Sequence, residues 1–69
     1  MTKAEAIIAI EQGKKVIHYY FQPGEFVFMN SSGQYETEDG YTLTIELFWD
    51  FHHNEIFDDE WEILEDQET

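Results

Sequence analysis

Hydrophobic and charged residues alternate most clearly near the C-terminus, in the stretch IFDDEWEIL. Phe57, Trp61 and Ile63 are separated there by carboxylates, and the stretch contains no positive charge. Because side chains two residues apart on a strand share one face, Trp61 and Ile63 would point to the core while Glu60 and Glu62 point to water. The pattern predicts a last strand with an aromatic anchor on one face and an acidic surface on the other.

The beginning of the chain predicts a helix over residues 3 to 12. Thr2 and Glu5 have the spacing of a capping box, in which two backbone N–H groups at the helix start are satisfied reciprocally. Apolar residues at helical spacing follow, and Gly13 provides a residue that readily ends a helix.

The middle of the chain predicts four short strands joined by tight turns. These segments are rich in β-branched and aromatic residues and are separated by glycine-containing turns. Pro23 and Gly24 fit the two central positions of a type II turn, and Asp39 with Gly40 predicts a hairpin turn of the primed type. The predicted strands are residues 15–21, 25–30, 34–38 and 41–43.

Residues 44–53 fit two structures. Alternating apolar residues favour a strand that continues the preceding hairpin, whereas Thr44 can cap a short helix in which Leu47, Phe48 and Phe51 share a face. We favour the helix. The resulting fold class is α+β: an N-terminal helix packed on an antiparallel sheet of four or five short strands, with a second short helix near residues 45–52. Residues 1–69 form one small domain, in which residues 65–69 are expected to be a frayed tail.

The charge of the chain is strongly asymmetric. The formal net charge is −13, with 16 acidic residues, only 3 lysines and no arginine. All three lysines lie within the first fifteen residues, whereas fourteen of the acidic residues follow them. Such a field repels nucleic acid and anionic membranes and attracts basic surfaces. An aromatic content of 17% nevertheless supplies enough large side chains for a folded core.

The composition also indicates the cellular compartment in which the protein works. The chain contains no cysteine, so it has no disulfide framework. No apolar run approaches the ~20 residues of a membrane-spanning helix, and the first residues lack the pattern of a secretory leader. We therefore expect a cytoplasmic protein, located in the cytoplasm of a host cell.

The order of these elements resembles a family of small phage-encoded proteins that includes the Thoeris anti-defence sponges. The similarity rests on the turn from Gly13 to Val16 (GKKV) and on the closing strand from Asp59 to Ile63 (DEWEI). The resemblance implies an oligomer that sequesters a small nucleotide-derived immune signal. The chain departs from the family at residues 17–20 (IHYY), where the family has a basic residue and a tryptophan that would help to bind such a molecule.

Catalytic, metal-binding and nucleotide-binding patterns are weak. The clustered carboxylates fit a solvated face better than an acid–base pair across a cleft, so we expect no enzymatic activity. Adjacent His52 and His53 would diverge rather than bind one ion, and no zinc spacing or calcium loop is present. We expect His18 to pack in the sheet and His52 to lie at the surface. No phosphate-binding loop occurs, and we expect no cofactor and no direct binding of nucleic acid.

The acidic surface is the feature that best indicates a function. Side chains on one face of a strand recur every ~6.6–6.8 Å, which is about the separation of successive phosphates along a nucleic-acid strand. The preferred function is therefore a non-enzymatic phage-type inhibitor that binds a basic, nucleic-acid-binding surface of a host protein, such as a nuclease or a CRISPR effector. The expected contact residues are Asp58, Asp59, Glu60 and Glu62, with Glu36, Glu38 and Asp39 contributing.

Two alternatives remain open. A sponge for a small nucleotide-derived signal would use Lys14, Lys15, Tyr19 and Phe21, brought together in a homo-oligomer. An accessory structural protein of a phage would carry its charge without a binding role.

Overall fold

The computed structural model describes residues 1–64 and has an α+β arrangement. The predicted frayed tail, residues 65–69, lies outside the described residues. The elements in chain order are α1 (Lys3–Glu11), β1 (Val16–His18), β2 (Val27–Met29), β3 (Tyr35–Thr37), β4 (Thr42–Leu43), α2 (Ile45–Phe51), the 3-10 helix η1 (Glu55–Phe57) and β5 (Trp61–Ile63).

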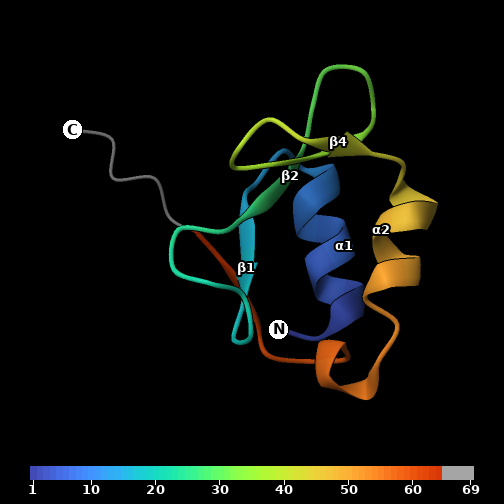
Figure 1. Ribbon diagram of the computed structural model, residues 1–69. Helices are drawn as coiled ribbons and strands as arrows, with labels where there is room; N and C mark the ends of the chain where they lie inside the picture. Colours follow the sequence, from blue (N-terminus) through green and yellow to red (C-terminus); the bar gives the residue numbers. More distant parts are fainter. Residues whose placement is uncertain (65–69) are drawn as a thin grey trace.

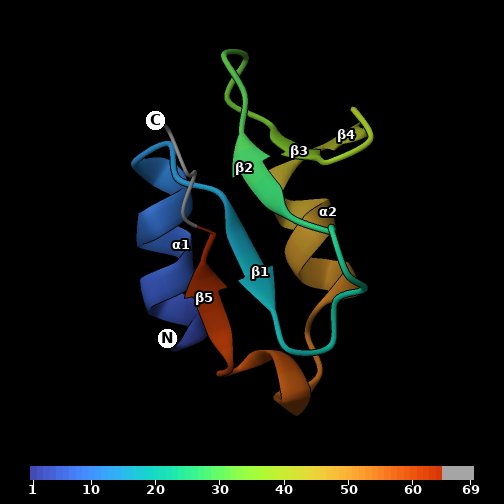
Figure 2. The same ribbon diagram turned by 90° about the vertical axis from the view of Figure 1, so that its left-hand side faces the viewer.

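The strands form one antiparallel sheet in the order β4-β3-β2-β1-β5. Both helices lie on one side of this sheet (Figure 1), and a view turned by 90° looks onto the other side (Figure 2). The predicted fold class is confirmed, including the second short helix. β1 and β5 share three residue pairs, whereas β1 and β2 share one, Val16 with Val27. The sheet is therefore staggered, with its two halves joined by a single pair.

The core lies between the sheet and the helices and is largely aromatic. Trp61 is fully buried, as the alternating pattern of the last strand predicts, and its indole Nε1–H donates to the Phe57 carbonyl at 2.8 Å. Tyr35 is also fully buried and accepts a hydrogen bond from Trp49 Nε1 at 3.1 Å. Burial raises the pKa of the Tyr35 hydroxyl, which therefore stays protonated. The buried hydrophobic residues are Ala6, Ala9, Ile10, Val16, Val27, Tyr35, Phe48 and Trp61.

The capping signals at the helix starts are confirmed. Thr2 accepts a hydrogen bond from the Glu5 backbone, and the Glu5 carboxylate accepts one from the Thr2 backbone. Thr44 accepts from the backbone N–H of Leu47 and so begins α2. Short helices depend on such caps, because each cap satisfies a donor that has no partner inside the helix.

The predicted apolar face of α2 is only partly correct. Phe48 is buried, but Leu47 is 47% exposed and Phe51 is 70% exposed. The helix has only seven residues, and it packs on the sheet along one narrow line through Phe48 and Trp49. Phe51 and Leu47 remain outside the core.

The observed strands are shorter than the predicted ones. The first ends at His18, because the Phe21 backbone N–H turns back to donate to the His18 carbonyl at 2.9 Å. Tyr19 and Tyr20 are consequently exposed in a turn, and the prediction of a strand to residue 21 is wrong there. The last strand covers only Trp61–Ile63, and η1 occupies the beginning of the predicted stretch.

The turns agree with the prediction in one case and differ in the other. Glu25 N–H donates to the Gln22 carbonyl at 2.9 Å and Gly24 has a φ of 87°, as a type II turn at Pro23 and Gly24 requires. The β3–β4 hairpin exists, but Asp39 is not among the residues with positive φ, whereas Gly40 has a φ of 85°. The predicted primed turn is therefore wrong. The loop is a three-residue connection that needs one left-handed residue, which glycine provides.

Asp39 stabilises this loop through its carboxylate. Hydrogen bonds from the Thr37 hydroxyl and then from the Tyr41 backbone N–H lower the pKa of Asp39 from its ordinary value of 3.8. A carboxylate whose pKa is lowered by folding stabilises the protein above its unfolded pKa, and this contribution is lost as the pH falls through the folded pKa.

We therefore expect Asp39→Ala to lower the free energy of unfolding at neutral pH, and this difference from wild type to shrink once the pH falls below 3.8. Urea unfolding at a series of pH values measures the difference. Asp39→Asn keeps an acceptor oxygen and serves as the matched control with the smaller loss. A difference for Asp39→Ala that stays constant down to acidic pH would contradict the role of the carboxylate.

Candidate functional site

The segment Asp58–Glu62 is acidic and comprises the connection from η1 to β5 and the first two residues of β5. Its four carboxylates belong to exposed residues, whereas Trp61 between them is buried. Asp58, Glu60 and Glu62 form no ion pair with another residue of the described range 1–64. We call this segment the acidic segment.

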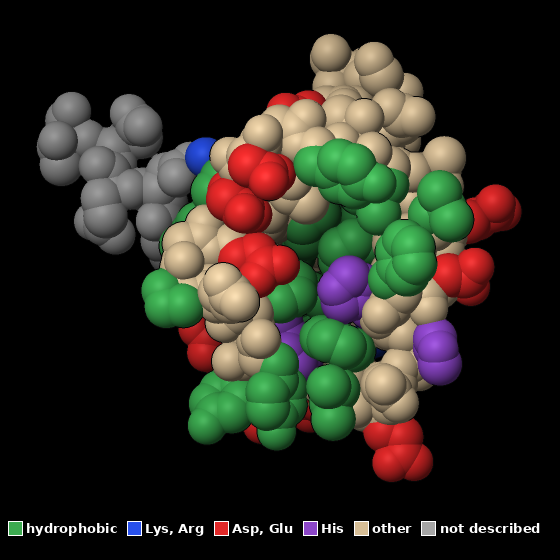
Figure 3. Space-filling model, viewed as in Figure 1, with side chains coloured by type: hydrophobic (Ala, Val, Ile, Leu, Met, Phe, Trp, Pro, Cys, Tyr) green, Lys and Arg blue, Asp and Glu red, His purple; other side chains and the backbone are tan. Residues whose placement is uncertain are grey.

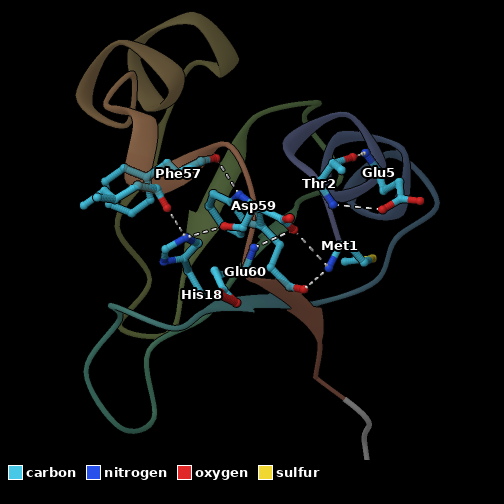
Figure 4. Close-up of polar contacts among 9 residues, drawn as sticks. Met1, Thr2, Glu5, His18, Phe57, Asp59 and Glu60 are labelled. Atoms are coloured by element: carbon cyan, nitrogen blue, oxygen red, sulfur yellow. Dashed lines mark hydrogen bonds and ion pairs between the residues drawn. The ribbon is translucent and has the colours of Figure 1, made fainter.

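A buried histidine fixes the backbone of the acidic segment. His18 is only 4% exposed, and its Nε2 lies 2.9 Å from the Ile56 carbonyl and 2.8 Å from the Asp59 carbonyl (Figure 4). Its Nδ1 accepts a hydrogen bond from the Tyr20 backbone N–H at 3.0 Å. Because Nδ1 is the acceptor, Nε2 carries the proton and donates to both carbonyls. The expectation that His18 packs in the sheet is confirmed, and its ring is also a bridge to the acidic segment.

The first residues of the chain hold the segment from the other side. The Met1 nitrogen donates to the Trp61 carbonyl at 2.6 Å and lies 3.8 Å from Asp59 Oδ1 (Figure 4). The Trp61 N–H donates back to the Met1 carbonyl at 3.1 Å, and the Lys3 N–H donates to the Asp58 carbonyl at 2.9 Å. The backbone of the acidic segment is thus held both by β1 and by the start of α1.

Glu60 adopts a backbone conformation that the sequence does not predict. Its φ is 74°, in the left-handed region, and its N–H is capped by Asp59 Oδ1 at 2.8 Å. Such a conformation costs a non-glycine residue about 1–2 kcal/mol. Glu60 therefore precedes β5 rather than lying on it, and the prediction that Glu60 and Glu62 reproduce a phosphate spacing on one strand is wrong.

The second predicted acidic group lies elsewhere on the sheet. Glu36, Glu38 and Asp39 belong to β3 and the loop after it, and β1 and β2 separate this strand from β5. Glu36 accepts from Asn30 Nδ2 and Glu38 from the Phe26 backbone N–H, each at 3.2 Å. These carboxylates stabilise neighbouring turns and strands, and they do not join the acidic segment in one cluster.

The residues of the predicted sponge site are also separated within the chain. Lys14 and Lys15 precede β1, whereas Tyr19 follows its other end and is 75% exposed. Phe21 is half-buried against Trp61, with ring centroids 5.6 Å apart. Of these four residues, only Phe21 lines either of the two pockets described within residues 1–64.

A groove that sequence analysis missed lies between α2 and strands β2 to β4. Its volume is about 200 Å³, and hydrophobic side chains surround it with a histidine at its edge (Figure 3). Its lining residues, which define what we call the aromatic groove, are Phe21, Glu25, Phe26, Val27, Thr37, Tyr41, Leu43, Phe48, Phe51 and His52.

His52 is one of the residues that line this groove. Its ring stacks on Phe48 with centroids 4.2 Å apart, and its Nδ1 donates to the Phe48 carbonyl at 2.7 Å. The expectation of a surface position for His52 is only partly correct, because the residue is half-buried. No local pattern indicates the groove, since its walls come from three separate stretches of the chain, 21–27, 37–43 and 48–52.

Within residues 1–64, no group of three histidine or acidic side chains is arranged to hold a metal ion. No helix in the same part of the chain is long and apolar enough to span a bilayer.

Comparisons with known proteins found no matching family model, no similar curated protein and no similar solved structure.

We expect His18→Ala to lower the free energy of unfolding by about 2–4 kcal/mol, because it leaves a cavity and unpaired polar groups. The orphaned groups are the carbonyls of Ile56 and Asp59 and the N–H of Tyr20. Urea denaturation measures the loss. His53→Ala is the control, since His53 is exposed and its replacement should change stability by less than about 0.5 kcal/mol. Equal effects of the two variants would show that His18 does not hold the acidic segment.

Proposed function

We propose that this chain is a non-enzymatic binding protein whose acidic segment contacts a basic, nucleic-acid-binding surface of another protein. The observation that carries the proposal is the combination of exposed carboxylates with a fixed backbone. Asp58, Glu60 and Glu62 are exposed, while His18, Met1 and Lys3 hold the backbone beneath them.

A fixed backbone favours binding because fewer degrees of freedom are lost when the partner arrives. Charged groups arranged in this way also speed association with an oppositely charged surface and select against acidic partners. The net charge of −13 extends this attraction beyond the segment itself. It also exceeds the magnitude of about 2–8 that a small domain needs for solubility.

The setting that the resemblance to phage proteins suggests is inhibition of a host defence protein. Nucleases and other defence effectors grip phosphates through lysine and arginine clefts, and a compact acidic domain would compete for such a cleft. The partner in this proposal is therefore a nuclease or another nucleic-acid-binding protein of the host.

The proposal is tested with two variants of equal net charge. Asp58→Asn/Glu60→Gln/Glu62→Gln neutralises the acidic segment and keeps Asp59, which caps the backbone of Glu60. The matched control neutralises three exposed carboxylates on the helices, Glu11→Gln/Glu46→Gln/Asp50→Asn. Each variant carries three negative charges fewer than the wild-type value of −13.

Affinity capture from an extract of host cells at low salt provides the partner, and binding to the purified partner is then titrated. We expect the segment variant to bind at least about tenfold more weakly than the control variant, because close charge pairs at an interface are individually worth more than a distant charge. We also expect affinity to fall steeply with salt and duplex DNA to compete. Equal losses in both variants would overturn the role of the acidic segment. If duplex DNA does not displace the protein from its partner, the proposal that the partner's surface binds nucleic acid is wrong.

A further inference from the structure

We propose that the aromatic groove is a binding site for a small quaternary ammonium compound of about the size of choline. The inference concerns a surface that the proposed protein partner does not use, so it does not rest on the proposed function. It follows from the ring content of the groove, from the exposure of its rim and from its charge.

Two aromatic side chains that line the groove, those of Tyr41 and Phe51, are largely exposed. Tyr41 is 64% exposed and Phe51 is 70% exposed, although burying such rings is strongly favourable. Neither ring has a ring–ring contact with another aromatic side chain of residues 1–64. Phe48 and His52, which also line the groove, form a stacked pair. A ligand that enters the groove therefore meets several aromatic side chains, and hydrophobic side chains gather on this face of the molecule (Figure 3).

The charge of the groove selects a cation over a neutral ligand. Glu25 lines the groove, and its carboxylate accepts one hydrogen bond, from the Gln22 backbone N–H at 2.9 Å. The net charge of −13 adds a general attraction for cations. Ring faces attract cations through their quadrupole, and aromatic cages with this composition bind quaternary ammonium groups.

The molecule already holds ammonium groups in this way. The Lys15 ammonium lies 4.9 Å from the ring centroid of Phe26, and the Lys3 ammonium lies 5.0 Å from that of Trp49. Phe26 is itself a residue of the groove. Rings of this domain are thus accessible to ammonium groups; because Lys15 already lies over Phe26, an added cation would contact the other rings of the groove.

The groove favours an alkylated ammonium over a primary one. A primary ammonium needs acceptors for three N–H groups, and most residues that line the groove are aromatic or aliphatic, with the Glu25 carboxylate as the one charged acceptor among them. A quaternary ammonium has no donor to satisfy, and its methyl groups pack against Leu43 and the rings. A volume of about 200 Å³ accommodates such a group together with a short stem.

The test compares choline with dimethylbutanol, its neutral carbon isostere, by amide and side-chain NMR titration of the full chain. We expect choline to shift the resonances of Phe51 and His52 at millimolar concentration and the neutral isostere to bind about threefold or more weakly, as the loss of a cation–π contact predicts. Equal binding of the two compounds would show that the groove binds apolar groups without regard to charge, and it would overturn the proposal. Absence of shifts in the groove with either compound would also overturn it.

Two variants and a control locate the site. Phe51→Leu keeps an apolar side chain but removes a ring face, and Glu25→Gln removes the charge; each should weaken choline binding about threefold or more. Tyr19→Leu removes a ring of similar exposure outside the groove and should leave binding unchanged. If Tyr19→Leu weakens binding as much as Phe51→Leu, the attraction is unspecific and the proposal fails.

A trimethyllysine peptide distinguishes a small-molecule ligand from a methylated protein. We expect it to bind no more tightly than choline, and a peptide that binds about tenfold more tightly would overturn the assignment to a small compound. The acidic-segment variant Asp58→Asn/Glu60→Gln/Glu62→Gln leaves every groove residue in place. Failure of choline binding therefore leaves the proposed protein interaction untouched, and the reverse also holds.

Discussion

Trp61 lies where the sheet, both helices and the closing loop meet, and its burial is the condition on which the fold depends. Its ring centroid is 4.7 Å from that of His18 and 5.3 Å from that of Trp49, and its Nε1–H is bound to the Phe57 carbonyl. A domain of this size buries only ~60% of its unfolded surface, so a few large rings must supply most of the hydrophobic stabilisation. His18 then attaches the acidic segment to this ring cluster through Nε2, which donates to the Asp59 carbonyl, while its Nδ1 accepts from the Tyr20 backbone N–H. The core and the acidic surface are therefore built by neighbouring residues.

Local signals predicted the parts of the fold that depend on neighbours in sequence. The capping hydrogen bonds of Thr2 and Thr44 span three residues, and the inward position of Trp61 follows from alternation along one strand. The turn at Gly24 likewise depends on a single residue that tolerates a positive φ. In each case, the chemistry of a few adjacent residues determines the structure.

The sequence does not predict the conformation of those segments whose structure depends on distant parts of the chain. The first strand ends at His18, where the Phe21 N–H turns back to the His18 carbonyl and the His18 ring binds the carbonyls of Ile56 and Asp59, which lie 38 and 41 positions further along the chain. Glu60 follows one of these carbonyls and adopts a left-handed conformation that propensity alone disfavours. Sequence analysis placed the carboxylates of the acidic segment at the surface, and the structure agrees. The aromatic groove could not be predicted, because Phe21, Tyr41 and Phe51 meet only after the sheet and α2 have packed.

The single residue pair between β1 and β2 leaves the two parts of the sheet with little backbone pairing between them. Val16 and Val27 form the only pair in their register, whereas β1 with β5 and β2 with β3 share three pairs each. Val27 and Tyr35 are nevertheless buried in the same core as Trp61, so β2 to β4 are joined to β1 and β5 mainly by side-chain packing. The placement of the aromatic groove relative to the acidic segment therefore depends on this shared core and not on the hydrogen-bond ladder of the sheet.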